Sequence, residues 1–383
     1  MASSLPAVAA PPAPEIIHWI ETPQELDKWL AAASSEQPLA LDTEFERVNT
    51  FYPIPGLVQL GLGDQYCLVD PDVAEASVVF REVLANPEIP KLLYAMSEDL
   101  ELFRHWLGIE LTGVVDLQIG AAMAGAGFSL GYARLVETLF GETLDKSATR
   151  SDWLARPLSD AQQRYAVDDI RFLEPMYRWV LESLKSRDLV EALFEESQRF
   201  ASELAAQDNP EQHYLKLRGG WALNPEQQAV LKELVRWREL ECQRRDMPRN
   251  RVFADALLIL VAERLPESMR ALGDIQGVPS GAVRRYGETI LELVRDARAA
   301  DNAGFERIAP PLSRDQQASF KQLKRTVRKV AEAADIPLEL VAPRKRLEKL
   351  MQDGELDGNP FFQGWREDLL APVRSQIEDI LKQ

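Results

Sequence analysis

Two carboxylates in one short segment are the first residues whose spacing suggests chemistry. Asp42 and Glu44 lie two positions apart in the run Pro38–Phe45 (PLALDTEF), whose apolar residues predict a β-strand. Residues two apart in a strand face the same side of a sheet, so we expect these carboxylates to lie side by side. Because like charges repel, the pair is favourable only when something positive lies between them.

Three further residues extend this set. Asp99 is expected near the start of a helix over 98–107, and Asp169 on a helix over 160–184. Tyr165 precedes Asp169 by four positions, so a helix places both on one face. Each residue alone has an ordinary explanation, such as a favourable charge in a first helical turn, a core aromatic ring or a solvated acid. Taken together and in this order, we interpret them as one site.

Clustered carboxylates with a nearby phenol suit the hydrolysis of a phosphodiester. That reaction requires charge to be neutralised on the attacking and departing oxygens, and a pair of Mg²⁺ or Mn²⁺ ions about 4 Å apart does this. Hard cations of this kind prefer carboxylate oxygen ligands. A phenol can hydrogen-bond the attacking water. The residue types therefore predict a nuclease-like centre with two divalent metal ions.

Composition argues against other kinds of catalytic centre. Among 383 residues there are two cysteines and three histidines, too few for a Cys/His zinc site of normal spacing. The sequence contains no Walker loop, HExxH or GxSxG motif. Two cysteines far apart in the sequence suit a reducing cytosol, and no apolar run is long enough to cross a membrane. We expect a cytoplasmic protein without membrane contact.

The net charge of −17 is unevenly distributed. Residues 1–210 carry −19, whereas residues 211–383 carry +2. The stretch 236–251 has six arginines against three acids, which fits either a solvated helix face or a surface for phosphate, and we favour phosphate contact. Further basic residues follow at Lys321, Lys324, Arg325, Arg328, Lys329, Arg344, Lys345 and Arg346.

The order of predicted elements indicates an α/β domain followed by two all-α modules. Three strands and then alternating helices and strands predict a mixed sheet flanked by helices over 15–207. Helical patterns then fill 211–298 and 304–383, with polar linkers between the parts. The Ala- and Pro-rich segment 1–14 is expected to be a disordered arm.

The two helical modules begin with similar residues. Pro225–Gln228 reads PEQQ and Arg314–Gln317 reads RDQQ. The similarity fits a duplicated module, and it equally fits two unrelated polar helix starts.

Three motifs resemble those of the DEDD superfamily of 3′→5′ exonucleases, in its tyrosine-bearing branch. They are LDTEF (41–45), MSEDLELF (96–103) and YAVDD (165–169), and the segments 46–60 and 144–170 are similar to the bacterial ribonuclease D family. The resemblance covers roughly residues 15–205 and implies a ribonuclease-H-like fold. It implies that Asp42, Glu44, Asp99 and Asp169 are metal ligands and that Tyr165 is a catalytic residue that positions the attacking water. One departure is Tyr94–Ala95, where many relatives have a histidine before the small residue.

The same resemblance extends to the helical modules and to substrate. Residues 211–298 resemble the helicase-and-RNase-D C-terminal (HRDC) domain, a nucleic-acid-binding module, and 304–383 occupies the place of its divergent second copy. We therefore expect an exoribonuclease that releases 5′-monophosphates from the 3′ ends of transfer RNA precursors and other small structured RNAs, with no obligate protein partner evident. The alternatives are a DNA exonuclease of the same superfamily and an RNA-binding scaffold with an inactive site.

Overall fold

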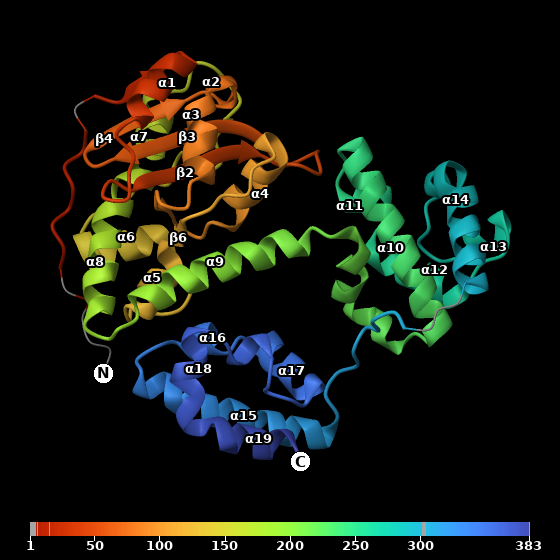
Figure 1. Cartoon of the computed structure of the whole chain (residues 1–383). Helices are drawn as coiled ribbons and strands as arrows, with labels where there is room; N and C mark the ends of the chain where they lie inside the picture. The colour runs from red at the N-terminus through yellow and green to blue at the C-terminus, as the bar shows by residue number, and fades with distance from the viewer. Residues whose placement is uncertain (1–4, 6, 15, 301–303, 383) are drawn as a thin grey trace. The chain divides into compact units, whose positions relative to one another are not determined.

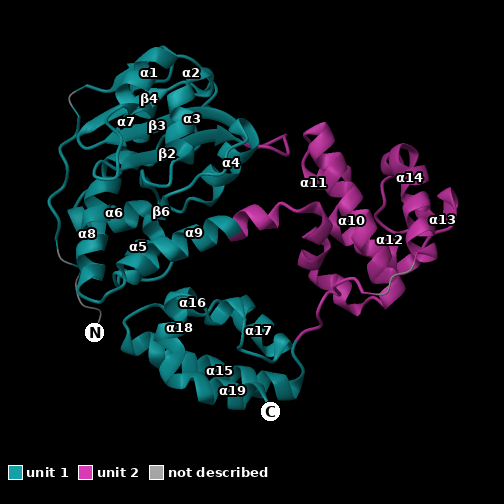
Figure 2. Ribbon diagram, viewed as in Figure 1, with its two compact units in different colours: residues 1–46, 54–202, 312–383 teal, residues 47–53, 203–311 magenta. Residues whose placement is uncertain are grey.

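The chain forms two compact units (Figures 1 and 2). The computed structural model describes residues 5, 7–14, 16–300 and 304–382. Unit 1 consists of residues 1–46, 54–202 and 312–383, and unit 2 of residues 47–53 and 203–311. Unit 1 therefore contains both the predicted α/β domain and most of the last predicted module. None of the helices in the described part of the chain combines the length and apolar character needed to cross a membrane.

Six strands in the described residues of unit 1 form one mixed sheet, in the order β1-β4-β3-β2-β5-β6. Their bounds are β1 His18–Ile20, β2 Leu39–Glu46, β3 Ile54–Leu62, β4 Gln65–Val69, β5 Lys91–Leu93 and β6 Val114–Asp116. β3 pairs antiparallel with β2 and β4, while β1 with β4, β2 with β5 and β5 with β6 are parallel. The predicted mixed sheet is confirmed, and β1 is a strand that the sequence pattern did not indicate.

The helices of the α/β part differ from the predicted ones mainly where a helix is interrupted. They are α1 Pro23–Leu30, α2 Pro71–Ala76, α3 Val78–Ala85, α4 Ser97–Leu107, α5 Leu117–Met123, α6 Tyr132–Phe140, α7 Asp160–Arg171, α8 Leu173–Lys185 and α9 Val190–Gln207 (Figure 1). The helix predicted over 160–184 divides at Phe172. Gly125 and Gly127 adopt positive φ between α5 and α6, so the backbone turns between these two helices.

The start of the chain packs where a disordered arm was predicted. Residues 1–4 and 6 lie outside the described residues. Further along, the backbone N–H of Val8 donates to the carbonyl of Leu139 at 2.8 Å. The guanidinium of Arg171 donates to the carbonyl of Pro11 at 3.0 Å. The described part of this arm is therefore held against unit 1.

In the described part of unit 2 all regular secondary structure is helical. Its elements are the 3-10 helices η1 Pro210–Lys216 and η2 Arg218–Ala222, then α10 Pro225–Arg245, α11 Arg249–Val252, α12 Asp255–Arg264, α13 Met269–Gly273 and α14 Ser280–Ala299. The loop 47–53 joins β2 to β3 and is fixed by residues of this unit. The carboxylate of Asp246 accepts hydrogen bonds from the N–H groups of Phe51 and Tyr52, both at 2.9 Å. The guanidinium of Arg249 lies over the Phe51 ring, 4.8 Å from its centroid.

The C-terminal helices share a core with the α/β domain inside unit 1. They are α15 Arg314–Ala333, α16 Leu338–Val341, α17 Arg344–Asp353, η3 Pro360–Phe362, α18 Trp365–Leu370, η4 Ala371–Val373 and α19 Arg374–Leu381. One hydrophobic cluster contains Val180 and Leu193 of α8 and α9 together with Leu323 and Ile377 of α15 and α19. The all-α module expected at this end is present, but its core is continuous with that of the preceding domain.

A buried ion pair joins these helices to α9. Arg366 donates two hydrogen bonds to the Glu196 carboxylate, at 2.6 and 2.8 Å, and both side chains are 1% exposed. Arg366 also donates to the carbonyls of Leu340 and Val341. Burial alone would raise the pKa of Glu196, but hydrogen bonds from Arg199 and Arg366 outweigh it and lower the pKa to about 2. The pair is therefore charged and well satisfied at neutral pH.

We expect Arg366→Leu to reduce the free energy of unfolding by about 3 kcal/mol. The buried Glu196 carboxylate then loses one of the cationic side chains that offset the cost of burying its charge. Arg344→Leu is the control, since it removes an exposed pair with Glu348 and should change stability by less than about 1 kcal/mol. Urea unfolding at pH 7 measures both.

The same pair gives a pH dependence of defined sign. The Glu196 pKa is lowered from 4.5 to about 2, so its contribution is complete above pH 4.5 and is lost as the pH falls towards 2. The stability difference between wild type and Arg366→Leu should shrink over that window. Either of two results would contradict this account of how the C-terminal helices are attached to α9. The stability difference could stay constant over that pH range, or it could be no larger than the difference measured for the control.

Candidate metal centre

The strand β2 places Asp42 and Glu44 on one face of the sheet, as the alternation predicted. Leu41 and Thr43, which alternate with them, are buried. The register between β2 and β3 shifts between Glu44 and Phe45, immediately after the second carboxylate. Central pairing on both sides of β2 therefore fixes the backbone that carries the two acids.

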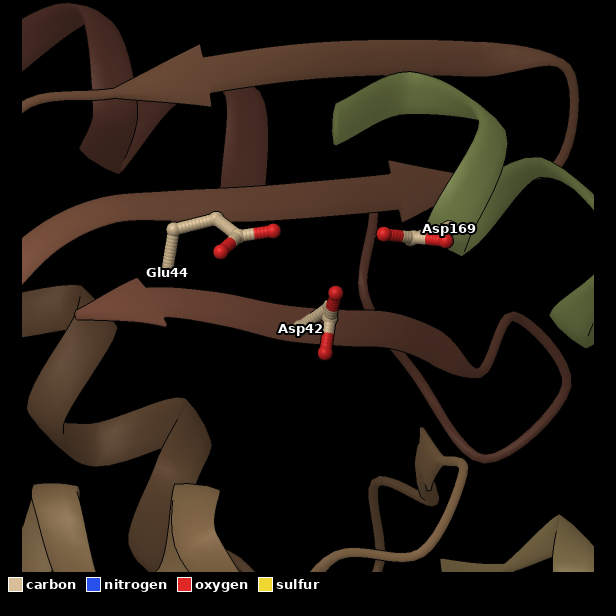
Figure 3. A group of neighbouring side chains, drawn as sticks. All are labelled: Asp42, Glu44 and Asp169. Atoms are coloured by element: carbon tan, nitrogen blue, oxygen red, sulfur yellow. The ribbon is translucent and has the colours of Figure 1, made fainter. Parts of the chain in front are cut away.

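The helix α7 brings Asp169 to the same place. Ser159 and Gln162 form a capping box that begins α7. Asp168 is occupied elsewhere, because its carboxylate pairs with Arg171 at 2.6 Å. One oxygen from each of Asp42, Glu44 and Asp169 lies within 4.8 Å of the others, and Figure 3 shows the three carboxylates converging. The structure thus unites three of the four predicted ligands.

Asp99 lies beside this group but outside the set that meets within 4.8 Å. Its carboxylate accepts a hydrogen bond from the Thr43 hydroxyl at 2.5 Å. The turn before α4 fixes its position: Ala95 has φ of 57°, and Asp116 accepts the N–H groups of Ala95 and Met96 at 3.1 and 3.2 Å. Asp99 remains close enough for its charge to raise the pKa of Asp42.

Burial and mutual repulsion raise the pKa of these carboxyls. For Asp42 the largest cause is burial, followed by the negative charges of Asp99, Asp169 and Glu44. Burial, then the charges of Asp169 and Asp99, raise the pKa of Glu44 to about 9. Burial likewise raises the pKa of Asp99 and of Asp169. The arrangement is therefore costly in the absence of a positive charge.

The donor set fits divalent cations. No Lys or Arg of the described residues forms an ion pair with Asp42, Glu44 or Asp169, so no side chain of that part of the protein neutralises them. All the available ligand atoms are carboxylate oxygens, which hard cations prefer. The neighbouring strand also contributes Gln59, which lies opposite Asp42 in the β2–β3 pair, is fully buried and has no hydrogen-bond partner for either amide atom in the described structure.

Tyr165 lies on the same face of α7 as Asp169, as its spacing predicted. Its phenol is near enough to the side chains of Asp169 and Thr149 for both to affect its pKa. Its ring lies against Trp153, with centroids 5.8 Å apart. Burial, followed by the charge of Asp169, raises the pKa of the Tyr165 phenol, so the group is a neutral hydrogen-bond donor at physiological pH.

Several positioning residues were not identified from the sequence. Thr43 holds Asp99, and Asp116 holds the start of α4. The Tyr132 hydroxyl donates to the Asp168 carbonyl at 2.7 Å, beneath the turn that carries Asp169. Tyr132 and Asp116 are distant in sequence from the residues they support, so no local pattern marks them. Thr43 was the one with a signal, because a hydroxyl between two strand carboxylates is unusual in a buried face.

The arginines of the stretch 236–251 have partners within unit 2, and the phosphate contact favoured above stays a prediction. Arg238 is fully buried and pairs with Glu239 and Asp255. The others also bind within unit 2: Arg236 to Glu211, Arg244 to Glu241, Arg245 to the Tyr286 hydroxyl, Arg249 to Glu239 and Arg251 to Asn49. Some of these partners lie within the stretch itself, as Glu239 and Glu241 do, and the others lie elsewhere in unit 2.

Three family models match consecutive parts of the chain. Residues 17–184 match a 3′-5′ exonuclease domain. Residues 227–294 match the HRDC domain, and residues 316–373 match the C-terminal HRDC domain of ribonuclease D. This is the order of domains that the sequence motifs implied.

Relatives match over nearly the whole length. The chain is 36% identical to a ribonuclease D of Pseudomonas paraeruginosa over 365 residues, covering 94% of this chain and 96% of that protein. It is 32% identical to ribonuclease D of Escherichia coli over 361 residues, covering 92% and 96%. The crystal structure of E. coli RNase D, described as an exoribonuclease involved in structured RNA processing, aligns with a TM-score of 0.84 and 31% identity, covering 96% of this chain and 99% of that one.

The converging carboxylates predict a stability effect. Two charges about 4 Å apart repel by roughly 4 kcal/mol at an effective dielectric of 20, before screening and proton uptake reduce this. Asp42→Asn should therefore raise the melting temperature in EDTA at pH 8, whereas Mn²⁺ should raise that of the wild type more than that of the variant. Thermal melts of both proteins, with and without Mn²⁺, measure this. A variant that melts below wild type in EDTA, with no response to Mn²⁺ in either protein, would show that these acids do not share a site.

Proposed function

The chain belongs to the ribonuclease D family and is a 3′→5′ exoribonuclease, and we propose that Asp42, Glu44, Asp99 and Asp169 hold the divalent cations on which its reaction depends. The observation that carries this proposal is the convergence of three carboxylates within 4.8 Å with no cationic side chain among them. The family and the acidic cluster together point to dependence on divalent metal. We propose that two ions bind and that they are Mg²⁺ or Mn²⁺.

The protein's own residues have distinct parts in the reaction. When bound, the cations would supply the positive charge that the attacking and departing oxygens of the phosphodiester require. Asp42, Glu44 and Asp169 would present ligand oxygens from a strand and a helix, and Asp99, whose Oδ1 accepts from Thr43, would add its other oxygen from α4. Tyr165 keeps its proton, so it orients the attacking water by donating a hydrogen bond and does not act as a base.

The substrates are proposed to be the 3′ ends of transfer RNA precursors and other small structured RNAs, shortened to 5′-monophosphates in the cytoplasm. The relative from E. coli, described as acting in structured RNA processing, supports this choice. We further propose that residues 15–207 form the catalytic segment and that 211–298 and 304–383 are its two HRDC modules, the family matches lying inside these bounds.

Digestion of one RNA labelled at either end tests this function. With Mg²⁺ or Mn²⁺, a 5′-labelled RNA should give a ladder that shortens from the 3′ end, and a 3′-labelled RNA should give labelled mononucleotide at once. EDTA should stop both reactions. A matched DNA strand degraded at least as fast as the RNA would favour the DNA exonuclease, and no degradation of either would favour the inactive scaffold.

Loss of a single ligand should abolish activity. Asp42→Ala or Asp169→Ala should leave less than a few per cent of wild-type turnover in that assay, because no neighbouring group can replace the lost oxygen. Asp168→Asn is the matched control, since its carboxylate pairs with Arg171 outside the cluster. Equal losses from Asp168→Asn and Asp169→Ala would mean that the chemistry does not depend on this particular acid.

Tyr165→Phe should lower turnover by roughly 10- to 1,000-fold, as expected on removal of a group that orients water. The affinity for Mn²⁺, measured by calorimetry, should stay within about threefold, because the phenol is not a ligand. Normal turnover in this variant would make Tyr165 a packing residue against Trp153.

A further inference from the structure

One face of α15 carries a continuous stripe of positive charge. The stripe consists of Lys321, Lys324, Arg325, Arg328 and Lys329, at spacings of three and four residues that place them on one side of the helix. The opposite side, with Leu323, Val327 and Ala331, is buried in the core of unit 1. Four of the five cations are exposed and Lys324 is half-buried. The stripe rises about 12 Å along the helix axis.

In the described part of the chain, no acidic side chain pairs with the positive charges of the stripe. In the described part of the chain none of its five side chains forms an ion pair, and Glu332, the next acid along the helix, does not pair with them either. Like charges four residues apart on a helix repel each other and destabilise it, and the stripe contains three such pairs. The stretch 236–251 shows the opposite design, since each of its arginines has a partner. The unpaired charges of α15 therefore point to an anion outside the chain.

We propose that this face of α15 binds the phosphate backbone of the RNA substrate, away from the nucleotide being removed. The inference rests on the proposed RNA substrate and adds where that RNA is held. Flexible basic side chains suit phosphates, whose contacts position a nucleic acid without reading its sequence. A membrane surface fits less well, because a membrane-bound helix inserts an apolar face and that of α15 is already buried.

A quadruple variant tests this face: Lys321→Gln, Arg325→Gln, Arg328→Gln and Lys329→Gln. The control removes four exposed, ion-paired arginines from elsewhere: Arg134→Gln, Arg270→Gln, Arg295→Gln and Arg344→Gln, whose side chains are 68%, 93%, 70% and 77% exposed. Both variants lose four positive charges. Affinity for a transfer RNA precursor is measured in an Asp169→Ala background over a series of salt concentrations, and turnover of a short single-stranded RNA is measured with Asp169 intact.

The stripe variant should bind the precursor about 10- to 100-fold more weakly than the control, and its logarithmic salt slope should be smaller by about 2–3. Turnover of the short RNA should stay within about twofold. Equal affinities and slopes in the two variants would overturn the proposal. Failure of the wild type to degrade the short RNA would instead count against the proposed function.

A second, independent observation concerns Gln59 on β3. This side chain is fully buried opposite Asp42, and neither amide atom has a hydrogen-bond partner in the described structure. A buried polar group without a hydrogen-bond partner is destabilising, so an apolar residue would stabilise the strand better. Directly opposed residues of an antiparallel pair have Cβ atoms about 5 Å apart, within reach of an amide-to-carboxylate hydrogen bond. We infer that Gln59 is a positioning residue, whose amide orients the Asp42 carboxylate when cations are bound.

Gln59→Met tests this role through metal affinity. Calorimetry should show Mn²⁺ binding weakened about 10- to 100-fold, as for other groups that orient a metal ligand, and the melting temperature in EDTA should not fall. Gln228→Met is the matched control, because that buried amide is satisfied by Leu223 and Ile308; it should melt lower and bind Mn²⁺ normally. Wild-type Mn²⁺ affinity in Gln59→Met would overturn the inference, whereas wild type that binds no Mn²⁺ would count against the metal site itself.

Discussion

Repulsion among half-buried carboxylates is the constraint on which this structure depends. Three acid side chains converge within 4.8 Å, a fourth lies beside them, and no cationic side chain of the described chain compensates them. Such a cluster survives folding only if the surrounding backbone is held firmly, because a mobile strand or helix would relax the charges apart. In the proposed metal site the same repulsion would favour divalent cations, since their binding would remove it.

Contacts within the sheet and contacts between distant segments together hold these acidic residues in place. The β2 strand is paired on both sides, and Thr43 and Asp116 hold α4 and its acid in place. Helices α8 and α9, which follow the catalytic helix, are covered by the C-terminal helices and tied to them by the Glu196–Arg366 pair. The last helical module therefore packs directly against the catalytic domain and supports it. Three domains that folded without contacting one another would lack this support.

Local patterns predicted much of this fold and site. Strand alternation was enough to place Asp42 beside Glu44, and helical spacing was enough to place Tyr165 beside Asp169. What the sequence could not show depends on distant partners: that Asp99 turns to Thr43, that Arg238 is buried among acids, and that α9 packs on α18.

The similar sequences at the starts of α10 and α15 also show what a local pattern can and cannot indicate. Leu223–Gln228 and Leu312–Gln317 begin α10 and α15 with a capping box and a glutamine amide that donates back to the preceding leucine carbonyl, both at 3.0 Å. Leu158–Gln163 begins α7 in the same manner, at 3.1 Å, although α7 belongs to the catalytic domain. The shared start is thus a general solution to helix capping, and the case for duplication rests on the two HRDC matches.

The central claim remains that the acidic cluster is a cation site. Anomalous diffraction from crystals soaked in Mn²⁺ tests it most directly: the account predicts a Mn²⁺ peak between Asp42, Glu44 and Asp169, and well-ordered carboxylates without a peak at saturating Mn²⁺ would contradict it.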